Sequence, residues 1–225
     1  MSNSIILIDN RDSFVYNLVD AFATTGNACT VFRNTVEPEQ VLTAEPDLVC
    51  LSPGPGHPSE AGRLMDILRA ALEAPGHGGR GVPVLGICLG FQALIEHFGG
   101  SVGPCGAVHG HSENMTLTEA GARHPVFAGL TVDRDPEHPE RDGSLVPVAR
   151  YHSLGCTSTP EGLRNLASIE TPRGPITMAA ETTVAEGPGR AMGLQFHPES
   201  VLSPAGPLIL QRSIEYLLTT HSATH

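Results

Sequence analysis

The chain has 225 residues, and its 24 acidic residues against 13 basic ones give a formal charge of −11. Every basic residue is an arginine. This balance argues against nucleic acid or an anionic membrane as a partner, because both select a basic surface. With 40% hydrophobic and 16% charged residues, we expect one folded domain over residues 1–225 rather than a disordered chain.

The sequence offers no obvious targeting or membrane segment. Its longest apolar run, residues 82–95, is short for a membrane span and is interrupted by glycines and Gln92. The apolar residues 4–8 are too few for a signal peptide, lack a basic flank and are followed by Asp9. We therefore expect a cytoplasmic protein.

Cysteine usage agrees with a reducing compartment. The number of cysteines is odd, and no two of them have the close spacing of a metal-binding pair. We expect neither a disulfide framework nor a cysteine zinc site. The five cysteines are Cys29, Cys50, Cys88, Cys105 and Cys156.

The first hundred residues alternate between strand and helix patterns. Residues 4–8 form a continuous apolar run typical of a buried parallel strand, and Ser13 is expected to cap a helix that ends at Gly26. Ser59 is expected to open a second helix. Short links between strands and helices predict a parallel sheet covered on both faces. Further strands are predicted at 28–32, 47–52 and 82–87, and a further helix at 89–98.

The pattern changes after Gly100, where short strand-like pieces are separated by glycines and prolines. These pieces predict a mixed or antiparallel sheet, followed by a last helix at about 207–218. Residues 133–144 (DRDPEHPERDGS) are polar and predict an exposed loop. The fold class expected is therefore α/β, with a central, mostly parallel but mixed sheet. The strand-like pieces are 115–117, 146–151, 166–169, 176–180 and 191–196.

A cysteine lies where a predicted buried strand meets a predicted helix. Residues 86–90 read GICLG, the pattern of a nucleophile elbow with cysteine in place of serine. The turn places the Cys88 sulfur at a helix N-terminus, which favours thiolate, and Leu89 offers a backbone N–H to an oxyanion. An inert buried cysteine in a glycine-rich turn is the alternative.

A cysteine nucleophile needs a base, and residues 195–200 (QFHPES) supply a candidate. His197 follows a strand-like run, and Glu199 is placed to hold the imidazole by its far nitrogen. A surface histidine in a turn is the alternative.

The segment SPGPG at residues 52–56 follows another predicted parallel strand. It would lie at the same carboxyl edge as Cys88, where open α/β sheets bind ligands. It matches neither a dinucleotide fingerprint nor a phosphate-binding P-loop. A plain proline turn is the alternative.

These motifs, in this order, resemble the class I (triad-type) glutamine amidotransferases. The likeness runs over nearly the whole chain and narrows to the amidotransferase subunits of two chorismate-aminating enzymes, anthranilate synthase and aminodeoxychorismate synthase. The matching pieces are LIDNRDSF at 7–14 with YNL at 16–18, LSPGPG at 51–56, GICLGFQ at 86–92, RYHSL at 150–154 and FHPES at 196–200.

The resemblance implies roles for individual residues. Cys88 would be the nucleophile, His197 its base and Glu199 the residue that orients the base. Gly56 and Leu89 would supply the backbone N–H groups of the oxyanion hole. The residues that would hold the substrate glutamine are Gly54, Pro55, Gly56, Gln92, Ser153 and Leu154.

The same resemblance implies the reaction and its partner. The chain would hydrolyse glutamine through a thioester on Cys88 and pass ammonia to a large chorismate-binding subunit, component I, for anthranilate and tryptophan synthesis. It implies no cofactor in this subunit, with Mg²⁺ expected on the partner. Alternatives are the same role in aminodeoxychorismate (folate) synthesis, a regulatory subunit with a silent glutaminase, and a hydrolase of γ-glutamyl peptides.

One departure concerns the stretch that reads H-G-K-x-S in the family. Here His109 is followed by glycine and then by His111, which replaces the lysine. Two histidines raise the question of a metal, but no acidic or cysteine ligand is placed beside them, and no metal is expected. If this stretch contacts the partner, the contact has lost a fixed charge.

Overall fold

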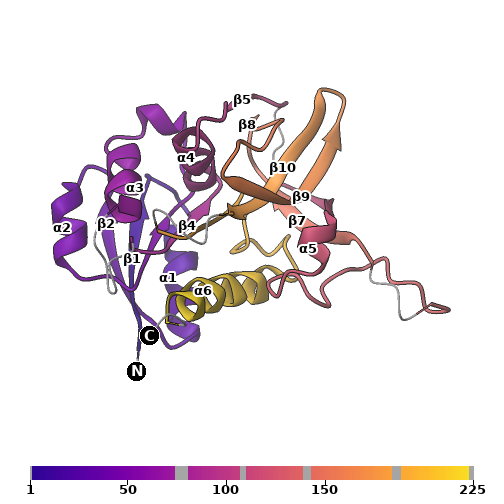
Figure 1. The fold of residues 1–225 in the computed structure, drawn as a ribbon, viewed down its shortest axis with the longest axis horizontal. Coiled ribbons are helices and arrows are strands. Elements are labelled where there is room, and N and C mark those ends of the chain that lie inside the picture. The colour runs from indigo at the N-terminus through magenta and orange to yellow at the C-terminus, as the bar shows by residue number, and fades with distance from the viewer. Residues whose placement is uncertain (1, 74–80, 107–109, 139–142, 184–188, 223–225) are drawn as a thin grey trace.

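The computed structural model describes residues 2–73, 81–106, 110–138, 143–183 and 189–222 (Figure 1). A nine-stranded sheet runs through it in the order β2-β1-β3-β4-β11-β10-β9-β6-β7, and β5 pairs with β8 as a separate small ribbon. The strands are β1 Ser4–Asp9, β2 Ala28–Arg33, β3 Leu48–Leu51, β4 Val84–Ile87, β5 Gly103–Pro104, β6 His111–Leu117, β7 Leu145–Arg150, β8 Leu154–Gly155, β9 Leu163–Thr171, β10 Gly174–Thr182 and β11 Ala191–Leu194. The helices are α1 Val15–Thr24, α2 Pro38–Thr43, α3 Leu64–Glu73, α4 Leu89–His97, α5 Glu119–Ala122 and α6 Gly206–Ser222, with a 3₁₀ turn at Pro58–Glu60.

The first five strands of this order form the parallel half of the sheet. Both of its faces are covered, as Figure 1 shows, so its inner strands are apolar on both sides, whereas the edge strand β2 is largely exposed. In β1, Ile5 and Leu7 point to the core shared with α1 and α6, whereas Ile6 and Ile8 point to the core shared with α2, α3 and α4. The predicted doubly covered parallel sheet is therefore confirmed.

The second half of the sheet is antiparallel. Strand β11 pairs with β4 on one side in parallel and with β10 on the other side antiparallel, so it joins the two halves. Strands β10, β9, β6 and β7 continue in antiparallel order. The mixed sheet expected after Gly100 is thus present, and most of its strands are longer than the strand-like pieces predicted from the sequence.

Two predicted helix starts are wrong. The N-cap of α1 is Phe14, which makes no side-chain cap hydrogen bond, so Ser13 is not the cap. Ser59 lies in the 3₁₀ turn, and α3 begins only at Leu64. Between them Gly62 has a φ of +62°, a conformation that breaks a helix and favours glycine.

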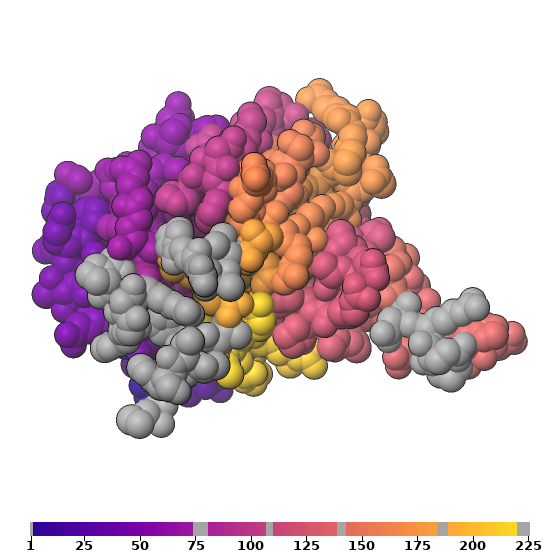
Figure 2. Space-filling model, in the orientation of Figure 1, coloured from indigo at the N-terminus to yellow at the C-terminus, as the bar shows by residue number. Residues whose placement is uncertain are grey.

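The predicted loop at 133–144 is exposed in its described part. Residues 133–138 are all exposed, and Figure 2 shows this segment standing away from the body of the molecule. The Asp133 carboxylate accepts backbone N–H groups from Ser144 and Leu145, each at 2.8 Å to Oδ1, and so closes the base of the loop. Within the described part of the chain, no helix is both long and apolar enough to cross a membrane.

Candidate active site

All the predicted site segments meet at the carboxyl edge of the parallel strands. Residues 10–14 follow β1, the segment Pro53 to Gly56 follows β3, Cys88 follows β4, and His197 follows β11. Residues 151–154 reach the same edge from the end of β7. This convergence of five loops is where an open α/β sheet binds its ligand.

Cys88 occupies a strained turn between β4 and α4. Its φ is +51°, which is rare for a residue other than glycine, and it serves as the N-cap of α4. Its own N–H donates to the Leu194 carbonyl at 2.8 Å, and its carbonyl accepts from Gln92 N–H at 3.0 Å. These bonds hold the strained backbone and place the sulfur at the helix N-terminus, as a nucleophile elbow requires.

Two glycines on either side make this turn possible. A Cβ at Gly86 would lie 2.5 Å from the Gly90 carbonyl oxygen, and a Cβ at Gly90 would lie 2.3 Å from the carbonyl oxygen of Leu51. Helix α4 therefore sits closer to the sheet than any side chain at these positions would allow. The GICLG spacing has the steric basis that the sequence indicated.

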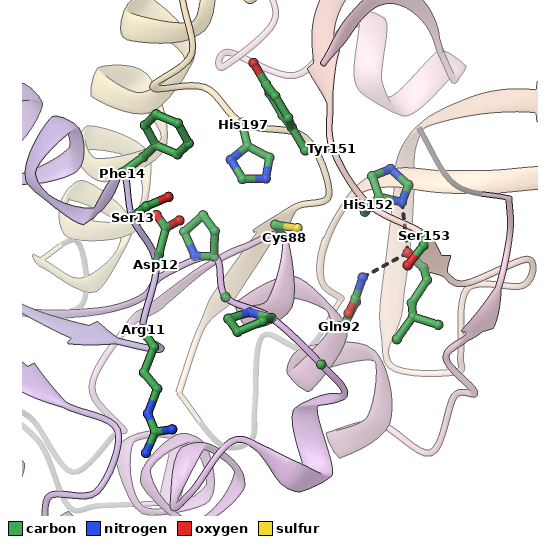
Figure 3. Close-up of a pocket in the computed structure, with 15 residues that line it drawn as sticks. Arg11, Asp12, Ser13, Phe14, Cys88, Gln92, Tyr151, His152, Ser153 and His197 are labelled. Atoms are coloured by element: carbon green, nitrogen blue, oxygen red, sulfur yellow. Dashed lines mark hydrogen bonds between the residues drawn. The ribbon is translucent and has the colours of Figure 1, made fainter. Parts of the chain in front are cut away.

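His197 and Glu199 form a tight pair beside the sulfur. The imidazole Nδ1 lies 2.6 Å from Glu199 Oε1, and both side chains are almost fully buried. With Nδ1–H donating to the carboxylate, Nε2 is left for the Cys88 sulfur. The ring of Tyr151 packs edge-on against the imidazole, with 4.9 Å between centroids. Figure 3 shows His197 and Cys88 facing the same space.

The electrostatics of this pair favour an imidazolium. Burial by itself lowers the pKa of His197, but hydrogen bonds and charge interactions with Cys88 and Glu199 outweigh it and raise that pKa to about 11. A protonated imidazole beside a cysteine at a helix N-terminus favours a thiolate–imidazolium pair. The structure thus brings the three predicted catalytic residues together.

Asp12 is a further acidic group at this site to which the sequence assigned no role. Burial raises its pKa, and the charge of Glu199 acts in the same direction. Both Asp12 Oδ2 and Glu199 Oε2 are buried without a hydrogen-bond partner among the described residues. The sequence signal that could have pointed to Asp12 is its position in the LIDNRDSF segment, which matches the family.

The loop after β3 carries Gly56, whose backbone N–H is one of the two predicted oxyanion donors. A Cβ at Gly54 would lie 2.5 Å from the Asn10 carbonyl oxygen, so this loop packs directly on the end of β1. The Asn10 side chain donates to the Ser52 carbonyl at 2.8 Å. Gly56 itself has a φ of +84° with free space around its Cβ position, so its backbone conformation, rather than crowding, requires glycine.

The far end of this loop is tied to α4. His57 Nε2 lies 3.2 Å from Glu96 Oε1, and its Nδ1 lies 2.8 Å from Ser59 Oγ. The loop that carries Gly56 is therefore anchored on both sides, and α4 also supplies the Leu89 N–H. As the first residue of that helix, Leu89 has no intrahelical acceptor for its N–H. Both predicted oxyanion donors therefore sit on segments that are fixed beside Cys88.

A pocket of about 390 Å³ opens above the sulfur. Gln92 projects into it from α4 and donates from Nε2 to the Leu154 carbonyl at 2.9 Å (Figure 3). The predicted glutamine-binding residues thus line one cavity with the nucleophile and the base, and its size suits a small amino acid. The lining residues are Arg11, Asp12, Ser13, Phe14, Pro53, Gly54, Pro55, Gly56, Cys88, Gln92, Tyr151, His152, Ser153, Leu154 and His197.

A second cysteine–histidine pair includes His152, which lines the pocket. Cys105 Sγ is 3.6 Å from His152 Nδ1, and that nitrogen is also 2.8 Å from the Leu154 carbonyl oxygen. Nδ1 must donate to this carbonyl, which leaves Nε2 as the acceptor of Arg150 Nε–H at 3.3 Å. Burial, followed by the charge of Arg150, lowers the pKa of His152 to about 4. Burial also raises the pKa of the Cys105 thiol.

Among the residues that the structure describes, no group of three or more His, Cys, Asp or Glu side chains is arranged to hold a metal ion. His111 starts strand β6 opposite Arg150, whereas His109 lies outside the described residues.

The sequence matches the model of the family described as glutamine amidotransferase class-I over residues 6–216. It is 57% identical over 214 residues to a Corynebacterium glutamicum protein named anthranilate synthase component 2, covering 95% of this chain and 98% of that protein. A Pseudomonas aeruginosa protein named anthranilate synthase component 2, pyocyanine specific, is 39% identical over 93% of this chain and 92% of its own.

Solved structures support the fold. A protein from Thermoplasma acidophilum, described as one subunit of a GMP synthase, aligns with a TM-score of 0.73 at 18% identity, covering 98% of this chain and 96% of that one. At that identity the likeness concerns the α/β architecture alone.

Proposed function

This chain belongs to the class-I glutamine amidotransferase family, and from that premise we propose that it is the glutaminase subunit of an anthranilate synthase. The observation that carries the proposal is the 57% identity, over almost its full length, to a protein named anthranilate synthase component 2. The site is consistent with it, because Cys88, His197 and Glu199 are assembled at one pocket.

The proposed reaction begins with the Cys88 thiolate attacking the side-chain amide carbon of glutamine. The oxyanion that forms is stabilised by the N–H groups of Gly56 and Leu89. His197, already protonated, gives its proton to the departing nitrogen, so the C–N bond breaks and ammonia leaves behind a γ-glutamyl thioester. Glu199 keeps the imidazole oriented and offsets its positive charge throughout.

The second half of the cycle regenerates the enzyme. His197, now neutral, takes a proton from a water molecule that attacks the thioester carbon. The C–S bond breaks, glutamate leaves, and the thiolate–imidazolium pair is restored. The ammonia passes to a chorismate-binding partner, component I, which would carry the Mg²⁺; this subunit needs no cofactor of its own. We place the pair in the cytoplasm, where tryptophan synthesis would use them.

The test combines the purified chain with an anthranilate synthase component I and chorismate. We expect anthranilate from either glutamine or ammonia with the wild type, and from ammonia alone with Cys88→Ala, because only the nitrogen source passes through Cys88. Loss of the ammonia-driven reaction in an assembled Cys88→Ala complex would contradict this division of labour. Formation of aminodeoxychorismate with the cognate partner, rather than anthranilate, would move the chain to the folate pathway.

A further inference from the structure

The Cys88 sulfur has a neighbour that the proposed reaction does not use. Gln195 follows strand β11 and is fully buried. Its amide Nε2 lies 3.7 Å from Cys88 Sγ, within hydrogen-bonding distance for a sulfur acceptor. Its backbone N–H donates to the Met178 carbonyl at 2.8 Å and fixes the residue against β10. A buried primary amide is expected to have hydrogen-bond partners, and here one partner is the reacting atom.

The orientation of this amide follows from the hydrogen-bond network. The Leu154 carbonyl can only accept, so the Gln92 atom 2.9 Å away must be its NH₂ nitrogen. The same nitrogen lies 3.3 Å from the side-chain amide of Gln195, which must therefore present its oxygen there. Its NH₂ group is left to face the sulfur. The opposite orientation would place two NH₂ groups together and a carbonyl oxygen against the sulfur.

We propose that Gln195 is a catalytic residue that donates a hydrogen bond to the Cys88 thiolate. This inference rests on the proposed role of Cys88 as the nucleophile. The sulfur is negative before it attacks glutamine and again when it leaves the thioester, and it is neutral in between. A donor to sulfur therefore stabilises the attacking and the departing thiolate, while Gly56 and Leu89 serve the oxyanion.

The arrangement suits a sulfur whose cationic partner changes its charge. His197 stabilises the thiolate as an imidazolium, but it must lose its proton during the cycle. The Gln195 amide has no proton to lose, so its hydrogen bond to the sulfur does not depend on the protonation of His197. It adds to the stabilisation by the imidazolium both when the thiolate attacks glutamine and when it leaves the thioester.

Alkylation of Cys88 by iodoacetamide tests this role without glutamine or partner. Gln195→Met keeps the length of the side chain and removes the donor. The donor lowers the pH needed to form the thiolate, so on the rising, acidic limb of the pH–rate profile we expect the variant to react about five- to tenfold more slowly than wild type, the range expected for a weak hydrogen bond to a charged group. At high pH, where the sulfur is ionised in both proteins, the two rates should converge. Gln211→Met, at an exposed glutamine on α6 that bonds Glu215, should react as wild type at every pH.

Equal rates for Gln195→Met and wild type on the acidic limb of the profile would overturn the inference, and so would a slowing that is the same at every pH, since that indicates a steric effect. If Gln195→Met does not fold, Gln92→Met leaves Gln195 in place but removes the donor that orients it. We then expect about a threefold slowing on the acidic limb with the same convergence at high pH, and no slowing would count against the role. Failure of wild-type Cys88 to react before the other cysteines would instead contradict the proposed function.

Discussion

Two cysteine–histidine pairs lie at the same edge of the sheet in the described part of the chain, and their electrostatic surroundings are opposite. His197 has Glu199 on its far nitrogen and a pKa raised to about 11. His152 has the Arg150 guanidinium on its far nitrogen and a pKa lowered to about 4. Both imidazoles are buried to a similar degree. Burial pushes both toward the neutral form. At His197 the hydrogen bonds to Cys88 and Glu199 outweigh burial, whereas at His152 the charge of Arg150 adds to it.

The two cysteine–histidine pairs also differ in their contacts with the rest of the site. The neutral His152 holds the Leu154 carbonyl, and that carbonyl in turn receives Gln92 in the pocket wall. Arg150 is itself paired with Glu113 Oε2 at 2.5 Å. The second pair therefore shapes the binding wall, whereas the first pair is the one that we propose moves protons. A cysteine next to a histidine is not by itself a nucleophile.

The largest effect is expected from the histidines. His197→Ala should lower kcat for glutamine hydrolysis by about 100- to 10,000-fold, the usual contribution of a general acid–base. Glu199→Gln should cost less, because this residue orients the base and does not carry the proton. His152→Gln should act mainly on KM through the pocket wall. Steady-state kinetics of the three variants decide the order, and a larger kcat loss in His152→Gln would reverse the assignment of the two pairs.

The cysteines should differ in reactivity in the same sense. A glutamine-like electrophile should modify Cys88 alone, because burial raises the pKa of the Cys105 and Cys156 thiols and raises that of Cys29 to about 11. Peptide mapping after labelling near pH 7 gives the answer. Labelling of Cys105 to the extent of Cys88 would show that the arginine-bearing pair is also active.

The imidazoles of His152 and His197 should change the pH dependence of stability in opposite directions. The lowered pKa of His152 means that the unfolded chain binds its proton first, so stability is lost as pH falls from about 6.5 toward 4. The raised pKa of His197 gives stability that is full below about 6.5 and is lost as pH rises through about 11.

Replacing His152 by glutamine isolates the acid-side loss. The variant should lose less stability than wild type between pH 6.5 and 4, by roughly 1–3 kcal/mol. Denaturant unfolding of both proteins at several pH values measures the difference. Parallel curves over this range would mean that His152 titrates normally in the folded protein.

The smallest effect concerns the arginine. In Arg150→Leu the pKa of His152 should rise from about 4, because the guanidinium charge is gone, but it should stay below the ordinary 6.5, since burial is the larger cause. An NMR titration of the imidazole follows it. No change in the pKa would show that burial alone sets the state of His152.

Much of the sheet could be predicted from the sequence because its inner parallel strands are apolar on both faces. The runs that became β1, β3 and β4 carry little else. Helix starts were harder to predict. Phe14 caps α1 without a side-chain hydrogen bond, and the six-residue helix α2 has no pattern long enough to mark it.

The triad could be predicted because each member lies in a local motif next to a strand end. The second pair could not, because it depends on contacts between distant segments. Cys105 meets His152 only where β5 pairs with β8, and Arg150 meets Glu113 across β6 and β7. Gln195 lies inside the matched segment at the end of β11, but only the geometry shows that its amide faces the sulfur.

The charge states of the two histidines test this account most directly. Nitrogen NMR of the imidazoles at pH 7 distinguishes a doubly protonated ring from each neutral tautomer. We predict that His197 carries protons on both nitrogens, and that His152 carries one on Nδ1 alone, with Nε2 accepting from Arg150. A neutral His197 or a charged His152 in the folded wild-type protein would contradict the claim that the neighbouring charge selects the reactive pair.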